Sequence, residues 1–329
     1  MGEARKARTA MPKLQADRAR QTLTGAAMGA HWQAVVHVAA HRDLAPVQAA
    51  MAAAVAEVEA QMSTWISGSD LNLLSDAAPG VWLDLPLHLM AVLARGLQIG
   101  VQSGGAFDIG LGDAALAWGF GPLPAREAAI LAARTAPRRP AHEVLELDVP
   151  GARARKHAPM RFDLNGIAKG YGVDRLAEVA LAQGLTRALL SIDGELRALQ
   201  GHPDGTPWAV AVDTPDPAAR TPHAVVELTD AAIATSGDYR HFVRAGSRTL
   251  SHTMDPARGH PLLTSPASVS VLAPDCCSAD AWATAYMVMG PDIGAALAAR
   301  LGQSVLFLSR NASGIQTTAT GIFARDTAA

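Results

Sequence analysis

Strand-type and helix-type segments are mixed along this 329-residue chain, without the regular strand–helix–strand alternation that builds a parallel sheet. Residues 43–62 and 87–101 carry apolar side chains at spacings of three and four, which predicts two amphipathic helices. Three further helices are predicted: one within 122–140, one that ends near residue 184 and one that begins near residue 278. Strands are predicted at 31–39, 160–164, 188–192, 208–212, 224–228, 268–272, 304–308 and 321–324. The pattern predicts an α+β fold of mixed, mainly antiparallel sheets with packed helices.

Composition and charge exclude several classes of protein. The formal net charge is −2, so no global field would recruit nucleic acid or an acidic membrane. No apolar run is long enough to form a membrane span. The adjacent Cys276 and Cys277 have neither the spacing of a zinc site nor that of an ordinary disulfide. Lysine occurs only at positions 6, 13, 156 and 169, and such a rare lysine suggests a site that favours a compact ammonium.

Residues 1–24 are predicted to be a basic, flexible tail, and residues 25–329 to be the folded domain. Six basic and two acidic residues lie in this tail, which lacks the apolar core of a signal peptide. As written, the sequence predicts a cytoplasmic protein. A periplasmic protein whose export signal had been removed would have the same sequence.

The segment 162–171 has the composition of a phosphate-binding turn, Phe-Asp-Leu-Asn-Gly-Ile-Ala-Lys-Gly-Tyr. A predicted strand ends at Asp163, two glycines allow a ligand close to the backbone, and a helix begins beside Lys169. Free N–H groups at a helix start, together with an ammonium group, attract phosphate. The alternative interpretation is an ordinary tight turn that Asp163 caps.

A second segment, 278–284, combines a carboxylate and a hydroxyl on one predicted helix face. Asp280 and Thr284 are four residues apart, and both are hard oxygen donors of the kind that Mg²⁺ prefers. In the alternative interpretation, Ser278 is the N-cap of the helix and Asp280 only interacts favourably with the helix dipole.

A histidine and several aromatic residues complete the candidates. His252, in Ser-His-Thr-Met-Asp-Pro, is the best candidate for a general base because the pKa of a free histidine lies near neutrality. Trp65 and Phe107 could face a flavin or adenine ring. Each of the three could instead be purely structural.

The order of these motifs along the chain resembles the ApbE-like family of flavin transferases. The matching series is Met-Gly-x-x-Trp, Met-Ser-Thr-aromatic, Gly-x-Phe-Asp, Trp-Gly-Phe-Gly, Asp-Leu-x-Gly-Ile-Ala-Lys-Gly-Tyr, Ala-Thr-Ser-Gly-Asp-Tyr-Arg, Ser-His-x-x-Asp-Pro and Ala-Asp-x-x-Ala-Thr-Ala. The resemblance runs from about residue 25 to about residue 321. It implies a single T-fold-like domain that binds FAD between its halves.

The resemblance also implies roles for particular residues. The FAD site would be lined by Met28, Trp65, Ala106, Phe107, Asp108, Asp163, Lys169 and Met254. Mg²⁺ would be held against the pyrophosphate by Asp280, Thr284 and the carbonyl of Gly166. The flavin would be joined to a Ser or Thr hydroxyl in a Ser/Thr-Gly-Ala-Thr-like motif of an acceptor flavoprotein, with release of AMP.

This chemistry agrees with the residues. Breaking a pyrophosphate bond requires neutralised phosphoryl charge, which Mg²⁺ and Lys169 would supply. The acceptor hydroxyl must lose a proton, for which His252 is the first choice as base and Asp280 the poorer one, because it would bind metal.

Two other activities fit the same residues. In Mg²⁺-dependent FAD hydrolysis to FMN and AMP, water would replace the protein hydroxyl. A non-catalytic FAD-binding protein would have no need of a metal at the pyrophosphate. The sequence also departs from the family pattern, since Trp65 replaces a tyrosine and Ala30 and Gly110 each replace a threonine.

Overall fold

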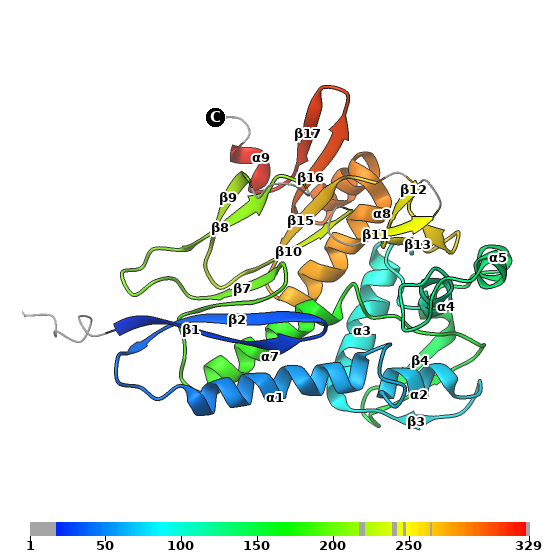
Figure 1. Cartoon of the computed structure of the whole chain (residues 1–329), viewed down its shortest axis with the longest axis horizontal. Helices are drawn as coiled ribbons and strands as arrows, with labels where there is room; N and C mark the ends of the chain where they lie inside the picture. Colours follow the sequence, from blue (N-terminus) through cyan, green and yellow to red (C-terminus); the bar gives the residue numbers. More distant parts are fainter. Residues whose placement is uncertain (1–17, 217–220, 239–241, 246–247, 264, 327–329) are drawn as a thin grey trace, which may run out of the picture.

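An eight-stranded antiparallel sheet forms the centre of the protein (Figure 1). The structure is a computed structural model that describes residues 18–216, 221–238, 242–245, 248–263 and 265–326. In spatial order the sheet contains β1 (Arg18–Ala27), β2 (Ala30–Ala39), β6 (Ala188–Ile192), β7 (Glu195–Leu199), β10 (Ala232–Gly237), β15 (Ser268–Ala273), β16 (Ser304–Asn311) and β17 (Gly314–Ala319).

Four smaller sheets complete the strands, and every pairing among the described residues is antiparallel. They are β3 (Leu83–Asp84) with β5 (Arg153–Lys156) and β4 (Leu145–Asp148), β8 (Trp208–Asp213) with β9 (Pro222–Leu228), β11 (Phe242–Ala245) with β12 (Arg248–Ser251), and β13 (Met254–Asp255) with β14 (His260–Pro261).

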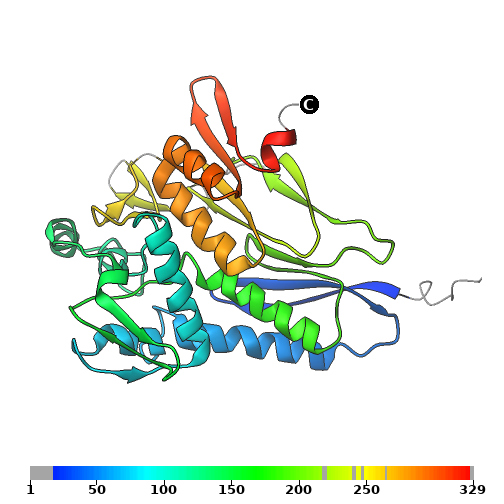
Figure 2. The ribbon, with the colours of Figure 1, turned by 180° about the vertical axis from the view of Figure 1, so that it is seen from behind.

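The long helices lie on one side of the large sheet, as the view from behind shows (Figure 2). The helix α7 packs on β6 and β7, and α8 packs on β10 and β15. The helices are α1 (Ala45–Met62), α2 (Asp70–Asp76), α3 (Leu87–Gln102), α4 (Gly112–Ala117), α5 (Glu127–Thr135), α6 (Ala141–Val144), α7 (Ala168–Ala182), α8 (Cys276–Arg300) and α9 (Phe323–Asp326). In the described part of the chain, no helix has the length and apolar character needed to cross a membrane.

Alternation along the strands separates the two faces of this sheet. In β2, Val36 packs in the cluster beneath α1 and α7, whereas its neighbour Val35 packs with Trp208 of β8 on the opposite face. Successive side chains of a strand point to opposite faces, and both faces here are apolar because both are covered. The predicted α+β class with mainly antiparallel sheets is confirmed.

The predicted boundary between tail and domain is wrong. The strand β1 begins at Arg18 and pairs with β2 over its whole length, and Leu23 on it is buried. The basic residues of this stretch lie on a strand that also has an apolar side. Counting the charges of the segment does not reveal this apolar side. Residues 1–17 of the predicted tail lie outside the described residues.

Two predicted strands are also wrong. Residues 160–164 form no ladder, since the N–H of Phe162 donates to the Ser75 hydroxyl and that of Asp163 donates to the Ile109 carbonyl. Residues 321–324 include the start of α9 instead. Gly321 has a φ of +62°, which takes the chain out of the extended conformation before Phe323.

Candidate active site

The start of α7 and the first half of α8 form the centre of the candidate site. The turn at residues 165–167 leads into α7, and the side chain of Asp163 accepts a hydrogen bond from the backbone N–H of Asn165 at 2.7 Å. The capping role of Asp163 in this turn is therefore real. At the start of α7 the N–H of Ala168 donates to the Leu164 carbonyl at 2.8 Å, so this donor is already used. Burial raises the pKa of Asp163.

Asp280 links α8 directly to this helix start. Its carboxylate is buried and accepts a hydrogen bond from the backbone N–H of Gly170 at 3.0 Å. A side chain on Gly170 would collide with α8, because a Cβ there would lie 2.3 Å from the carbonyl oxygen of Cys276. Glycine at this position thus allows the close helix contact that brings Asp280 to α7.

The alternative interpretation of Asp280 as a residue of a Ser278-capped first turn is wrong. The N-cap of α8 is Asp275, whose carboxylate accepts from the backbone N–H of Ser278 at 2.7 Å. Asp280 lies inside the helix and faces a different element. Helix capping therefore does not explain why the Asp280 carboxylate is buried.

Thr284 lies one turn further along α8, beside Gly166. A Cβ on Gly166 would be 2.9 Å from the Thr284 hydroxyl oxygen and 3.4 Å from the ring of Phe107. The Thr284 hydroxyl also lies 3.3 Å from that of Ser236 at the end of β10. The predicted set of Gly166, Asp280 and Thr284 thus comes from the turn before α7 and from α8, with Phe107 beside Gly166.

Carboxylates surround the ammonium of Lys169. Its Nζ lies 2.9 Å from Oε1 of the buried Glu195 and 3.4 Å from Oδ2 of Asp193. Burial alone would lower the pKa of Lys169, but the charges of Glu195, Asp280 and Asp193 outweigh it and raise that pKa. Burial and the charge of Glu195 raise the pKa of Asp280 to about 7. The centre therefore holds more acidic groups than its one ammonium can neutralise.

Asp174 links α7 to α8 through hydrogen bonds. Its two carboxylate oxygens accept from the backbone N–H groups of Cys276 and Cys277, each at 2.9 Å, at the start of α8. Arg197 of β7 donates to the same carboxylate at 2.6 Å. A residue of α7 therefore satisfies free donors of α8, which fixes the spacing of Lys169 and Asp280.

One further predicted residue, Met28, lies next to this centre. The side chain of Met28 reaches α7, where a Cβ on Gly172 would lie 2.9 Å from its Cε. Met28 itself has a φ of +47° in the turn between β1 and β2. A left-handed conformation is uncommon for methionine, and at functional sites such strain is often retained.

The loop with Ala106, Phe107 and Asp108 runs beside the Asp163 turn. The N–H of Asp163 donates to the carbonyl of Ile109 at 2.9 Å, which joins the two loops. Asp108 accepts from the N–H of Gly110 at 2.7 Å, and burial raises its pKa. At Gly110, a Cβ would lie 2.8 Å from the sulfur of Met160, so this methionine side chain would have to shift.

Among the described residues, no hydrogen bond joins Trp65 or Met254 to the centre. Trp65 is exposed on the loop after α1, as a ring that stacks on a ligand would be. His252 is half-buried in the short segment between β12 and β13. Met254 packs in a separate apolar cluster with Trp118. Their assignments to catalysis and FAD binding stay predictions.

Sequence reasoning missed Glu195, Asp193, Asp174 and Ser236 as parts of this site. Asp193-Gly194-Glu195 is a tight turn between two strands, and its spacing does not show that it lies opposite Lys169. Asp174 follows Lys169 by little more than one helical turn, which was a usable signal. Ser236 lies within the Ala-Thr-Ser-Gly-Asp-Tyr-Arg motif, whose Tyr239 and Arg240 lie outside the described residues.

The fold is an antiparallel α+β fold, with an ammonium and oxygen donors gathered at the start of α7. Residues 28–307 match the model of the ApbE family, and the chain belongs to this family. The predicted family is thereby confirmed.

Two relatives of this chain share one name. The chain is 32% identical over 268 residues to the FAD:protein FMN transferase of Vibrio cholerae serotype O1, covering 81% of this chain and 80% of that protein. It is 28% identical to the FAD:protein FMN transferase of Escherichia coli K12, covering 90% and 86%. The predicted enzyme class, a transferase, is confirmed.

Solved structures agree with this assignment. The flavin transferase ApbE from Vibrio cholerae matches with a TM-score of 0.82 at 30% identity, covering 94% of this chain and 99% of that one. The apo form of the Pseudomonas stutzeri flavinyl transferase ApbE matches with a TM-score of 0.81 at 32% identity, covering 94% and 97%.

Proposed function

We propose that this protein is a Mg²⁺-dependent FAD:protein FMN transferase. It would attach FMN from FAD to a Ser or Thr hydroxyl in a Ser/Thr-Gly-Ala-Thr-like motif of an acceptor flavoprotein and release AMP. The observation that carries the proposal is the meeting of α7 and α8, which brings Lys169, Gly166, Asp280 and Thr284 together. The names of the relatives support FAD as the substrate.

The chemistry of the donor set fits Mg²⁺. Asp280, Thr284 and the Gly166 carbonyl are hard oxygen donors, and Mg²⁺ characteristically uses few protein ligands and completes its shell with water and substrate phosphate. Among the described residues, no group of three or more His, Cys, Asp or Glu side chains could hold a metal by itself. The excess of carboxylates around Lys169 also favours a divalent cation. When bound, Mg²⁺ would neutralise charge on the pyrophosphate.

The residues of the chain supply the remaining steps. Lys169 would bind the phosphates and hold them in line for displacement. The acceptor hydroxyl would attack the phosphorus on the flavin side, forming a phosphate ester while the pyrophosphate bond breaks and AMP leaves. His252 would take the hydroxyl proton.

An assay with FAD, Mg²⁺ and an acceptor domain bearing the motif tests this proposal. We expect covalent flavin on the acceptor, seen by fluorescence in a denaturing gel, with one AMP released for each flavin transferred. Asp280→Ala and addition of EDTA should each abolish transfer. Full transfer by Asp280→Ala would remove this residue from the metal site.

The same assay separates transfer from hydrolysis. If AMP and free FMN form while the acceptor stays unlabelled, the protein is an FAD pyrophosphatase. If FAD remains intact with Mg²⁺ and acceptor present, the protein only binds FAD.

A further inference from the structure

A cavity of about 760 Å³ lies away from the candidate active site, between the end of α2, the segment before α6 and the chain after β5. None of the residues assigned above to FAD, metal or catalysis lines it. Its charged lining consists of four cationic and two acidic side chains, a net charge of +2: Lys156, Arg138, Arg139, Arg161, Asp76 and Asp113. This volume is within the range of small-ligand pockets.

The acidic side chains of the lining are already paired with arginines. Arg138 lies 3.0 Å from Asp113, and Arg161 lies 2.5 Å from Asp76. The excess positive charge therefore belongs to Arg139 and Lys156. Arg139 pairs with Glu143, which does not line the cavity. Its Nε lies 3.5 Å from the Glu143 carboxylate and its Nη2 donates to the Glu143 backbone carbonyl at 3.2 Å, and both side chains are largely exposed.

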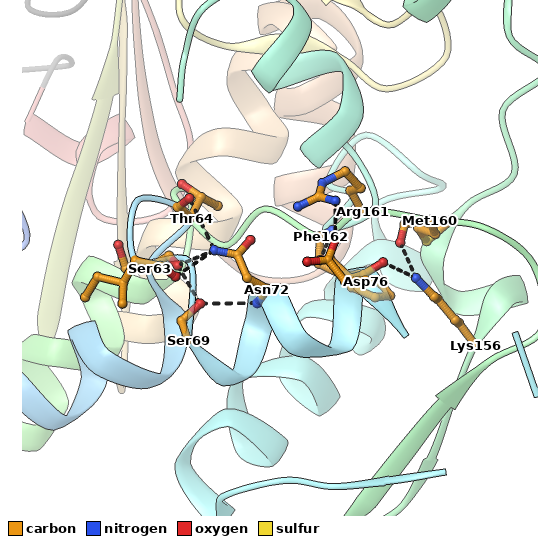
Figure 3. A network of polar contacts seen from close by, with 11 residues as sticks. Ser63, Thr64, Ser69, Asn72, Asp76, Lys156, Met160, Arg161 and Phe162 are labelled. Carbon is orange, nitrogen blue, oxygen red and sulfur yellow. Dashed lines mark hydrogen bonds and ion pairs between the residues drawn. The ribbon is translucent and has the colours of Figure 1, made fainter. Parts of the chain in front are cut away.

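Lys156 is a buried ammonium without a carboxylate partner in the described part of the chain. The residue is 3% exposed, and its Nζ donates to the backbone carbonyls of Ser75 and Met160 (Figure 3). Burial, and then the charge of Arg161, lower the pKa of Lys156. The charge of Asp76 acts in the opposite direction on this pKa, but Asp76 is itself paired with Arg161, so an anion in the adjoining cavity would stabilise the buried ammonium.

The two carbonyl bonds explain only part of this arrangement. Ser75 lies in the last turn of α2, where an ammonium group satisfies free carbonyls and interacts well with the helix dipole. That role does not require a cavity, nor the further cations of Arg139 and Arg161 beside it. Ammonium and guanidinium groups together are the usual ligands of phosphate.

We propose that the cavity beside Lys156 is a second anion site, which binds a small phosphate-bearing molecule of nucleotide size or smaller. Lys156 and Arg139 would contact the phosphate. Arg161 and Arg138 line the same cavity and are oriented by their ion pairs with Asp76 and Asp113. The site is separate from the pyrophosphate site at Lys169, and its existence does not depend on the transfer reaction.

Calorimetric titration with inorganic pyrophosphate tests the proposal. The protein is first saturated with FAD in EDTA, so that the phosphate site at Lys169 is filled and metal-dependent binding is absent. We expect saturable binding of one pyrophosphate per chain at constant ionic strength. Absence of saturable binding would overturn the proposal.

Variants identify where the anion binds. Lys156→Met should weaken pyrophosphate binding by about tenfold or more, the usual effect of losing a charge-assisted contact. Arg139→Ala removes an exposed side chain with little risk to folding, and should weaken binding by about two- to fivefold. Arg153→Ala, an exposed and ion-paired arginine outside the cavity, is the matched control and should bind as the unmodified protein does.

Two outcomes contradict this assignment. One is that the unmodified protein, Arg139→Ala and a folded Lys156→Met all bind pyrophosphate with the same affinity. The other is binding that disappears in Arg153→Ala as much as in Arg139→Ala, which would show a diffuse charge effect. If Lys156→Met does not fold, Arg139→Ala and Arg161→Ala decide the question.

Discussion

At the scale of single residues, the site depends on positions where only a glycine fits. Gly166 lies against Thr284, and Gly170 lies against the backbone of α8. In both cases the missing side chain allows two elements to approach closely. Gly166 and Gly170 therefore allow the close contact of this segment with α8.

Gly166→Ala should weaken Mg²⁺-dependent turnover. The new Cβ would lie 2.9 Å from the Thr284 hydroxyl oxygen, so the hydroxyl or the Gly166 carbonyl must shift. We expect the Mg²⁺ concentration for half-maximal activity to rise by about tenfold, as for other lost or displaced metal contacts. A titration of activity with Mg²⁺ measures this.

The control for that variant is Gly68→Ala, where the added Cβ would meet nothing within 4 Å. It should leave the Mg²⁺ requirement unchanged. An unchanged requirement in Gly166→Ala as well would show that Gly166 and Thr284 are not metal neighbours.

His252→Ala should slow flavin transfer about 10²- to 10⁴-fold, the usual contribution of a general base, while FAD binding persists. The loss should appear in kcat rather than in the KM for FAD. Stopped assays for transfer and fluorescence titration for binding separate the two quantities. Transfer at the full rate would assign His252 a structural role.

At the scale of elements, Asp174 of α7 holds α7 and α8 together through its hydrogen bonds to the start of α8. Asp174→Ala would leave the backbone N–H groups of Cys276 and Cys277 without their acceptor and Arg197 without its ion pair. We expect the free energy of unfolding to fall by about 3 kcal/mol, because a partly buried charged group loses its partner. Urea unfolding followed by circular dichroism measures the change.

Glu178→Ala is the matched control on the same helix. Its side chain is largely exposed, and within the described residues its ion pair is with Arg175, one turn away. It should alter the urea midpoint far less than Asp174→Ala does. Equal effects would show that the contact between α7 and α8 contributes little to stability.

The elements that the sequence predicted well are those with a strong local pattern. Residues 43–62 and 87–101 have a helical apolar period and correspond to α1 and α3. Residues 160–164 have the composition of a strand, but their hydrogen bonds go to Ser75 and Ile109, far away in sequence. The same limit applies to the site: motif spacing found Asp280 and Lys169, while Glu195 could be found only by folding the chain.

At the scale of the whole molecule, the large sheet continues further toward the N-terminus than charge alone indicates. Arg18, Arg20 and their neighbours form the first half of β1, the edge strand of this sheet. Alternation lets such a strand carry cations on one side and Leu23 on the other. Charged side chains on an edge strand also discourage pairing with other molecules.

Removal of residues 1–24 should therefore destabilise the protein, because it deletes seven residues of β1 (18–24) and exposes one edge of β2. Loss of the buried Leu23 alone should cost about 2 kcal/mol, and the lost ladder adds to this. We expect a fall in Tm of at least about 5 °C in differential scanning calorimetry. Removal of residues 1–17 is the control, and should leave Tm nearly unchanged if the predicted tail ends before β1. Equal Tm values for the two deletions would show that the first half of β1 adds nothing to the stability of the sheet.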